Sequence, residues 1–494
     1  MKRQRFGQEA AIEDISIQHG TPEISGYYSL VLLLLLGLSL AWSVLFRAGV
    51  WPADWQPTLL IVGLVSSFYW FTAHRGARAP ALKTYMRVSL LLLFADLILQ
   101  LIPLPPFLLA ILSPARADLL HDLTSAGIHV TTAPLSVAPS LSLLYLFSFA
   151  GYLLTFLLIR ELCWRSSSGC WRMAIPLIVI GSLESLLGII QNFRGSPGSE
   201  VTGTYTNRDH FSSFLEMILP LAVVYGLVLL RRGREQGGLS IRGALAVAFV
   251  WGAAATIFVA IVYSLSRAGF LVAVITLLFI LSLCIEVRGR PILKPARIGA
   301  LLLILLAMLI FLPTNMLLNR FGSMTAPTDV EGDARFPIWK QTIPLILKFP
   351  VFGCGLGGYE SAFLRYQQTN NNFGVQFAHN DYLQYLAELG IVGFSLLAVC
   401  AGSIVSETTR AVFESENSEK RLLAVASAGS ILAIALHSMV EFDTYIPANA
   451  MTLAWIAGIA SSLGAGLPTK QKQLPTKSAA RSEKSALEIP ASSK

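Results

Sequence analysis

Two arginines lie where long apolar segments of the sequence begin, and their surroundings favour anion binding. Arg267 lies in the short polar turn 263–269, and Arg208 lies in Gly203-Thr204-Tyr205-Thr206-Asn207-Arg208-Asp209-His210, before another apolar segment. A guanidinium group can bind phosphate through two parallel hydrogen bonds, and free backbone N–H groups at a helix start add to the positive field. The sequence therefore predicts an anion site that includes both arginines. The alternatives are a local ion pair between Arg208 and Asp209, and arginines that only anchor helix ends.

A histidine precedes a further apolar segment, at the end of a long polar stretch. The sequence there reads Ala378-His379-Asn380-Asp381, in which Asn380 is a good helix N-cap and Asp381 suits the positive end of a helix. His379 then lies at the mouth of the helix, where an imidazole can act as a general base near neutral pH. A purely structural histidine is the alternative. Glu388 follows nine residues later on the opposite helix face, so we do not expect it to orient His379 directly.

Other polar motifs give weaker signals. The stretch Gly353-Cys354-Gly355-Leu356-Gly357-Gly358 has neither the Walker A nor the dinucleotide-binding spacing, so we expect a tight turn rather than a phosphate loop. His437 and Asp443 lie near the mouth of the last apolar segments and could join an outer site. No Asp-x-Asp pair occurs in the outward-facing segments defined below, so the sequence predicts no metal site.

Membrane-spanning helices are the elements that must position these residues. Apolar residue types make up 54% of the 494 residues and charged types 13%, whereas a soluble domain carries about 25% charged residues. The apolar residues form blocks long enough to cross a hydrocarbon core of ~30 Å, which excludes a soluble enzyme and a disordered protein. About twelve spanning segments are predicted, at 27–46, 58–73, 88–104, 140–160, 174–191, 209–230, 243–263, 268–285, 298–314, 381–405, 422–438 and 448–466.

The basic residues predict the orientation of this all-α membrane protein. With the N-terminus inside, 27 of the 37 Lys and Arg residues fall in cytoplasmic segments and 10 fall outside, as the positive-inside rule requires. The net charge of +8 is therefore attributed to topology, and no nucleic-acid partner is expected. An even number of spans places both termini in the cytoplasm. Eight of the ten outside residues are Arg, among them Arg335, and this excess favours a functional role for some of them.

The chain is expected to divide along this topology. We predict a cytoplasmic N-terminal tail at 1–26, transmembrane helices 1–9 within 27–314, a periplasmic loop at 315–380, helices 10–12 within 381–466, and a disordered cytoplasmic tail at 467–494. The long loop is small for an independent domain, so it should pack on the membrane bundle as short helices. Acidic residues inside the predicted spans need partners there, and these residues are Asp96, Glu184, Glu216 and Glu388.

The motifs, in their order along the chain, resemble the O-antigen ligase and O-antigen polymerase superfamily of bacterial lipid-linked glycan transferases. The resemblance covers about 170–465, and its carriers are Gly203 to His210 with Leu219-Pro220, Ser264-Leu265-Ser266-Arg267, Arg335-x3-Trp339 leading to Pro350-Val351-Phe352-Gly353-Cys354-Gly355-x-Gly357, and His379-Asn380-Asp381-Tyr382-Leu383 with Glu388-x-Gly390-x-x-Gly393. Many members read Asn-x-Asn where this chain has Asn207-Arg208-Asp209, so one polar contact of that element differs here.

The resemblance implies a GT-C-like fold and a glycosyltransferase at the outer face of the bacterial inner membrane. Such enzymes take a glycan from undecaprenyl diphosphate and pass it to lipid A core, a growing polysaccharide or a protein, with no metal or other cofactor. It implies that His379 and Arg267 are catalytic and that Arg208, Arg335, Asn207 and Asn380 bind the diphosphate or glycan. A multi-pass transporter, or an export partner for a polysaccharide or anion, is the alternative from the composition alone.

Overall fold

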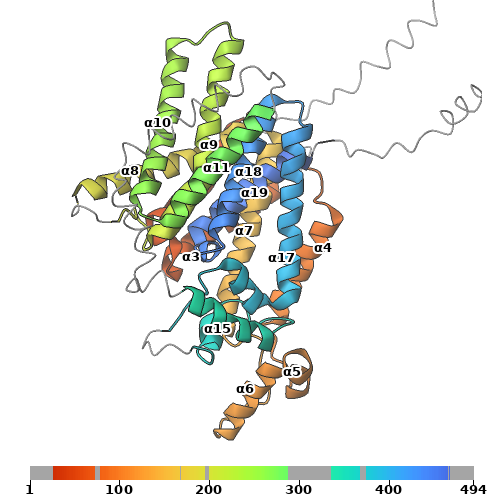
Figure 1. Ribbon diagram of the computed structural model, residues 1–494. Helices are drawn as coiled ribbons and strands as arrows, with labels where there is room; N and C mark the ends of the chain where they lie inside the picture. The colour runs from red at the N-terminus through yellow and green to blue at the C-terminus, as the bar shows by residue number, and fades with distance from the viewer. Residues whose placement is uncertain are drawn as a thin grey trace, which may run out of the picture.

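The computed structural model describes residues 26–72, 78–166, 169–194, 200–286, 335–367, 374–465 and 467. Within these ranges the regular elements are helices (Figure 1). The α-helices are α2 (Gly26–Leu45), α3 (Pro52–Thr72), α4 (Thr84–Leu99), α5 (Pro106–Leu112), α6 (Pro114–Ser125), α7 (Pro139–Arg165), α8 (Ile175–Arg194), α9 (Arg208–Glu235), α10 (Ile241–Tyr263), α11 (Arg267–Glu286), α15 (Arg335–Lys348), α16 (Tyr359–Phe363), α17 (Asp381–Glu414), α18 (Ser418–His437) and α19 (Pro447–Ala465). Short 3₁₀ helices are η2 (Arg47–Gly49), η3 (Cys170–Met173) and η6 (Asp443–Tyr445).

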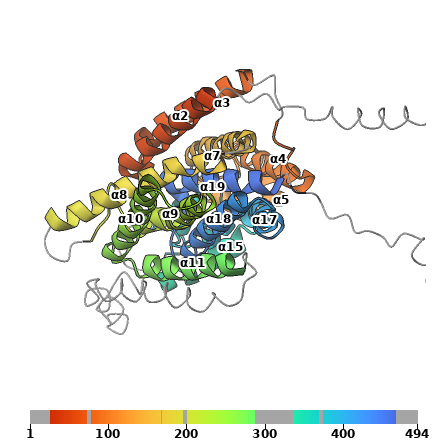
Figure 2. The ribbon, with the colours of Figure 1, turned by 90° about the horizontal axis from the view of Figure 1, so that it is seen from above.

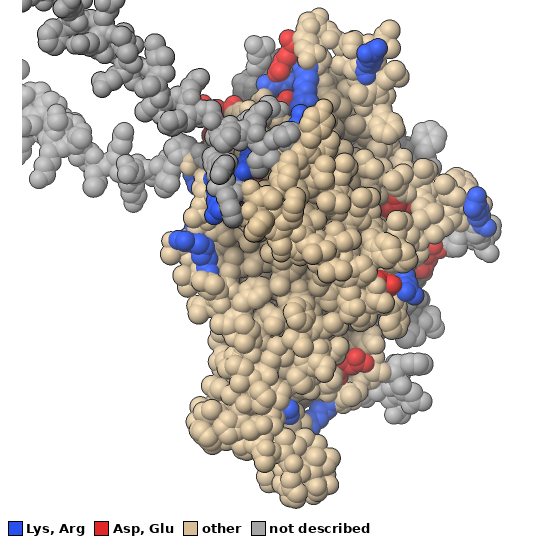
Figure 3. Space-filling model, turned by 180° about the vertical axis from the view of Figure 1, so that it is seen from behind, with Lys and Arg blue, Asp and Glu red and all other residues tan. Residues whose placement is uncertain are grey.

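The described chain contains nine helices long and apolar enough to cross a membrane. They coincide with nine of the predicted spans, while α3 and α4 overlap most of the predictions 58–73 and 88–104. The prediction 298–314 lies outside the described residues, as do 1–25 and 468–494 of the predicted tails. Most of the face in Figure 3 consists of uncharged residues, as a surface in contact with lipid requires. The described chain is therefore that of a multi-pass, all-helical membrane protein.

Most predicted boundaries are displaced by a few residues, and two of them have a clear physical reason. The prediction 88–104 runs past α4, which ends at Leu99, because Pro103 disfavours helical backbone at the residue before it. The prediction 381–405 stops short of α17, which continues to Glu414. The polar end of α17 is stabilised inside the bundle, where the buried Glu407 accepts a hydrogen bond of 2.6 Å from Ser461 Oγ of α19.

Helix α19 lies at the centre of the bundle because its sequence is rich in small residues. Most of it is buried, and α7, α17 and α18 pack around it (Figure 2). At Gly458 a Cβ atom would lie 2.7 Å from the carbonyl oxygen of Phe156 on α7, so only glycine allows this approach. Small residues let helix backbones come close in a membrane, where dispersion contacts replace the hydrophobic driving force. Helices α2 and α3 lie at the edge of the bundle in Figure 2.

The described part of the predicted loop packs on one end of the bundle through a break in α17. Gly390 has φ 60° and ψ −168°, a conformation that favours glycine, and it interrupts the helix. The freed N–H groups of Ile391 and Val392 donate to the carbonyl oxygens of Pro350 and Val351, at 2.8 and 3.1 Å. The loop thus replaces the missing helical hydrogen bonds, as a helix break in a membrane protein demands.

A buried carboxylate holds the glycine-rich turn against this break. Glu388 Oε2 accepts from the Gly357 N–H at 2.7 Å and from the Tyr445 hydroxyl at 2.7 Å, and Glu388 Oε1 accepts from the Tyr359 N–H at 3.1 Å. The backbone N–H groups of the turn are used in this docking, which confirms the predicted tight turn. Glu388 therefore has partners other than His379, as the helical geometry predicts.

The remaining buried acids of the spans also hold neighbouring segments. Glu184 Oε1 of α8 accepts from the Thr204 N–H at 2.6 Å and fixes the segment that leads into α9. Glu216 of α9 lies 3.0 Å from His437 Nδ1 of α18. Asp96 Oδ2 lies 3.5 Å from Gln100 Nε2, which binds the Phe352 carbonyl at 3.0 Å. Each acid thus helps to fix a helix, or the loop before α17, in place.

Candidate functional site

The site lies where α9, α15 and α17 begin, and its centre is a histidine–carboxylate pair. His379 Nδ1 lies 3.0 Å from Glu441 Oε2, in the link between α18 and α19. The His379 side chain is 34% exposed, whereas that of Glu441 is 1% exposed. The contact holds the imidazole through Nδ1, and Nε2 is the ring nitrogen that takes no part in it. This arrangement is the one in which a carboxylate orients a histidine that exchanges a proton at its second nitrogen.

The backbone at His379 is held in an uncommon conformation. Its φ of 49° is in the left-handed region, which a histidine adopts only when the surrounding structure fixes it. On one side the Trp339 indole N–H of α15 donates to the Ala378 carbonyl at 2.9 Å. On the other side the Asp381 N–H donates to the Ser438 carbonyl at 2.9 Å. Contacts from two different elements therefore set the direction of the His379 side chain.

Arg335 joins α15 to the same carboxylate. Its Nη2 donates to Glu441 Oε1 and lies 3.7 Å from Asp209 Oδ2 at the start of α9. Trp339, four residues after Arg335, lies on the same helix face, which explains the Arg335-x3-Trp339 spacing. The structure therefore brings together two of the predicted site residues, Arg335 and His379, through an acid that the sequence motifs do not include.

The ring of Phe442 separates the exposed histidine from a buried one. His379 and His210 each meet the Phe442 ring edge-on, with ring centroids 5.0 and 4.5 Å away. His210 Nδ1 lies 3.0 Å from Asp443 Oδ1. Two acids of the link between α18 and α19 therefore contact one histidine each: Glu441 contacts His379, and Asp443 contacts His210.

Asn380 and Asp381 attach the start of α17 to this link. The Asn380 side chain caps α17 by accepting a backbone N–H at 3.0 Å, and it donates to the Met439 carbonyl at 2.8 Å. Asp381 Oδ2 accepts from Ser438 Oγ at 2.6 Å and from the Thr444 N–H at 3.1 Å. The predicted N-cap is confirmed, and the structure adds a positioning role for both side chains.

Arg208 and Asn207 lie at the start of α9, next to the Asp209 that faces Arg335. Asn207 caps the helix by accepting the Asp209 N–H at 2.8 Å, and Arg208 forms an ion pair with Glu200. Arg267 begins α11 after the tight turn, as predicted, and Ser266 caps that helix by accepting the Gly269 N–H at 3.0 Å. Of these residues, Asn207 and Arg208 adjoin Asp209, which lies 3.7 Å from Arg335, whereas Arg267 begins a different helix.

Helix α11 packs closely against α9 just beyond Arg267. A Cβ atom at Gly269 would lie 2.5 Å from Ser212 Oγ and 3.0 Å from Glu216 Oε1. Arg267 is therefore at the end of α11 that touches the first turns of α9. Of the two weaker candidates for the site, His437 is fully buried against Glu216, and Asp443 pairs with His210.

One residue at the centre of the site, Glu441, lies outside the motifs from which the site was predicted, in a short link after α18. His210 ends one of those motifs but was given no role, and it contacts the ring of Phe442 beside the site. The signal that could have found Glu441 is its position: an acid between the apolar residues Val440 and Phe442, at the mouth of two spans, requires a cationic partner. Among the described residues no group of three His, Cys, Asp or Glu is arranged to hold a metal ion.

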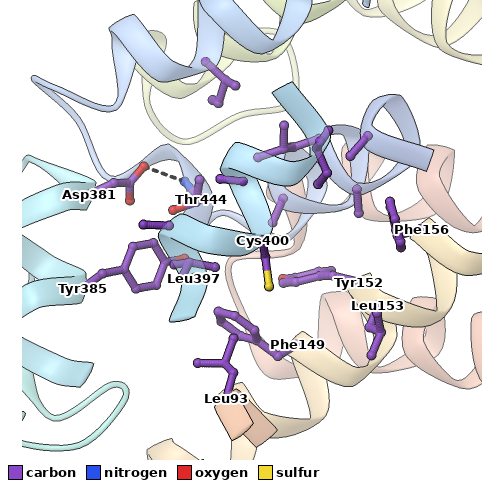
Figure 4. A pocket seen from close by; sticks show the side chains of 18 of the residues that line it. Leu93, Phe149, Tyr152, Leu153, Phe156, Asp381, Tyr385, Leu397, Cys400 and Thr444 are labelled. Atoms are coloured by element: carbon purple, nitrogen blue, oxygen red, sulfur yellow. Dashed lines mark hydrogen bonds between the residues drawn. The ribbon is translucent and has the colours of Figure 1, made fainter. Parts of the chain in front are cut away.

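A long apolar cavity of about 500 Å³ opens beside the site (Figure 4). It lies between α4, α7, α17, α18 and α19, and residues such as Leu93, Phe149 and Leu397 line it. Its polar lining is at one end, where Asp381 and Thr444 form the hydrogen bond drawn in Figure 4. That end adjoins the segment that carries His379.

The electrostatics of the site keep the central carboxylate ionised. Burial raises the pKa of the Glu441 carboxyl, but the hydrogen bond and charge of His379 and the charge of Arg335 outweigh burial and lower this pKa to about 2. An ionised acid next to His379 stabilises the imidazolium that forms when the ring accepts a proton. The pair is therefore arranged for general base chemistry at the rim of the bundle.

A comparison with protein families gives a match to part of the chain. Residues 252–398 match the family model described as O-antigen ligase. The matched region contains the predicted site residues Arg267, Arg335, His379 and Asn380, and it confirms the resemblance that the motifs predict. With the apolar helices, it supports a membrane protein of polysaccharide biosynthesis with a ligase- or polymerase-like glycosyl transfer function. A comparison with curated proteins gives no match.

The lowered pKa of Glu441 predicts how the stability of the site depends on pH. The carboxylate stabilises the fold fully above the ordinary glutamate pKa of 4.5, and this contribution is lost as the pH falls toward the folded value of about 2. The difference in thermal midpoint between the wild type and Glu441→Gln in detergent should be constant from pH 7 to pH 5 and should shrink below about pH 4.5. A difference that already shrinks between pH 7 and pH 5 would contradict the lowered pKa.

Proposed function

We propose, from the O-antigen ligase match across residues 252–398, that this chain transfers a glycan from undecaprenyl diphosphate to an acceptor hydroxyl at the outer face of the bacterial inner membrane. The acceptor is a lipid A core, a growing polysaccharide or a protein. The observation that carries the proposal is the cluster of His379, Glu441 and Arg335, which joins three elements at one end of a membrane bundle.

His379 is the general base in this proposal. With Nδ1 donating to the ionised Glu441, the Nε2 nitrogen has the lone pair that accepts the proton of the acceptor hydroxyl. The acceptor oxygen forms its bond to the anomeric carbon of the donor sugar while the bond from that carbon to the diphosphate oxygen breaks. The bonding electrons leave with undecaprenyl diphosphate. A positioned base of this kind contributes about 10²–10⁴-fold to the rate.

Three arginines bind the leaving diphosphate in this proposal: Arg208, Arg267 and Arg335. Asn207 caps α9, on which Arg208 lies, and Asn380 caps α17, directly after the base His379. Guanidinium groups fixed at a partly dry site stabilise the negative charge that grows as the glycosidic bond breaks. Arg335 is already bound to Glu441, but the five N–H donors of a guanidinium allow a second anion on the same side chain. Arg335 thereby couples the base and the leaving group.

The apolar cavity holds the polyprenyl chain of the donor. Along α17 its lining runs from Asp381 to Val405, which is about 36 Å of helix and comparable to the ~30 Å hydrocarbon core. A donor whose diphosphate lies at the polar end would have its hydrocarbon chain in the apolar part of the cavity, where the chain needs no polar partner.

The same proposal includes the finer topology. The chain has twelve spans, both termini lie in the cytoplasm, and the loop at 315–380 lies in the periplasm. The excess of Lys and Arg in the segments predicted to be cytoplasmic supports this orientation, in which α15 and the His379 cluster lie on the outer side. A transporter would be expected to place its polar groups near the midplane, whereas the His379 cluster lies at the helix starts of one end.

The lipid-linked glycan pool of a deletion strain tests the function. We expect lipid-linked glycan to accumulate in the deletion strain, to be cleared by the wild-type protein, and to persist with His379→Ala, which should lower transfer by about 10²–10⁴-fold. Accumulated single repeat units would identify a polymerase and accumulated long polymer a ligase. A pool that does not change on deletion, or that His379→Ala clears normally, would contradict the proposal.

Narrowing the cavity tests the place of the polyprenyl chain. Ala401 of α17 lines the cavity, and Ala401→Trp should raise the KM for the undecaprenyl-linked donor about tenfold, while a short-chain soluble donor should be unaffected. Val399→Trp is the matched control, because Val399 is exposed on the same helix and does not line the cavity. Equal KM values in both Trp variants would argue against this site for the chain.

A further inference from the structure

A second cavity, of about 260 Å³, lies on the outer cap of the bundle. It is formed by α6, the end of α15 and the segment 361–366 that contains part of α16, and Figure 1 shows these elements at the same end of the molecule. None of its lining residues belongs to the His379 cluster or to the apolar cavity. The function proposed above does not use this pocket.

The lining of this pocket combines an apolar floor with polar groups at the rim. Phe349 and Ala362 of the floor are buried, and the exposed side chains of Asp118, Lys348 and Ser361 surround them. A pyranose ring has apolar C–H faces and a circumference of hydroxyl groups, so a small pocket of this composition matches it. The aromatic ring of Tyr366, half-buried at the same pocket, adds a flat surface with a polar tip.

Helix α15 fixes the distance between this pocket and the His379 cluster. Arg335 begins the helix in the cluster and Lys348 ends it at the pocket, a span of thirteen residues or about 20 Å. Between these ends Trp339 is bound to Ala378, and the Thr342 hydroxyl lies 2.7 Å from the Tyr359 hydroxyl. The helix is thus attached to both regions, and a glycan of several sugar units is long enough to join them.

We infer that this pocket binds a sugar residue of the donor glycan, several units away from the bond that is broken. The inference rests on the proposed glycan transfer. It adds to that function that the protein recognises the length of its donor glycan. A donor trimmed to its first sugar cannot reach the pocket, whereas the intact donor gains binding energy from it. The pocket therefore affects KM for long donors and leaves the chemical step unchanged.

Filling the pocket tests the inference. Lipid-linked glycan isolated from the deletion strain would be offered intact or trimmed to the sugar next to the diphosphate. Ser361→Trp and Lys348→Ala should raise the KM for the intact donor about three- to tenfold, with kcat and the KM for the trimmed donor unchanged. Lys340→Ala is the matched control, since Lys340 is exposed on α15 and does not line the pocket. The same KM for the intact donor in Ser361→Trp and in the wild type would overturn the inference.

A binding measurement separates failure of the inference from failure of the proposed function. The glycan released from its lipid would be titrated into His379→Ala protein in detergent and followed by saturation-transfer NMR. Binding that is kept in His379→Ala and His379→Ala/Lys340→Ala but lost in His379→Ala/Ser361→Trp supports the pocket, whether or not the wild type transfers glycan. Binding that persists in His379→Ala/Ser361→Trp, or that is absent from His379→Ala itself, overturns it. Thermal midpoints equal to that of the wild type would show that the variants fold.

Discussion

The end of the bundle where α9, α15 and α17 begin depends on one buried carboxylate. An ionised acid that is 1% exposed must have cationic or hydrogen-bonding partners, because an unpaired buried charge is too costly to persist. Glu441 has His379 on one oxygen and Arg335 on the other, and Arg335 also faces Asp209. Satisfying this single charge therefore brings together the start of α9, the start of α15, the segment before α17 and the link between α18 and α19.

A second set of buried acids also needs partners, but these acids hold segments of the fold in place. Glu388, Glu184 and Glu216 are also buried, but their partners are backbone N–H groups, a tyrosine hydroxyl and a histidine with no exposed surface. These contacts fix the loop before α17 and the segment that leads into α9, rather than holding a titratable group at the surface. The difference between the two sets is access, because His379 alone among the histidines described above is partly exposed. Because His379 is partly exposed, a reactant can reach the imidazole of the His379–Glu441 pair.

Local sequence signals predicted much of the fold and part of the site. Apolar length located eleven spans that overlap described helices, and Asn380 predicted the start of α17 because capping depends only on neighbouring residues. The glycine-rich stretch predicted a turn for the same local reason. Glu441 was not predicted, since its role follows from contacts with residues 62 and 106 positions away in the chain. The partners of Glu388 were not predicted for the same reason. The loop packs against Glu388 because α17 is broken at Gly390, and no periodicity in the sequence reveals this break.

A double-mutant cycle on His379 and Glu441 tests the central claim. This claim is that Glu441 acts through His379, by orienting its imidazole and by placing a negative charge next to it. Transfer of lipid-linked glycan would be measured for the wild type, His379→Ala, Glu441→Gln and the double variant, each checked for folding. If Glu441 acts through His379, Glu441→Gln should lower kcat by at least about tenfold, and the double variant should be no slower than His379→Ala. Losses that multiply in the double variant would show that the two residues act independently and would contradict this account.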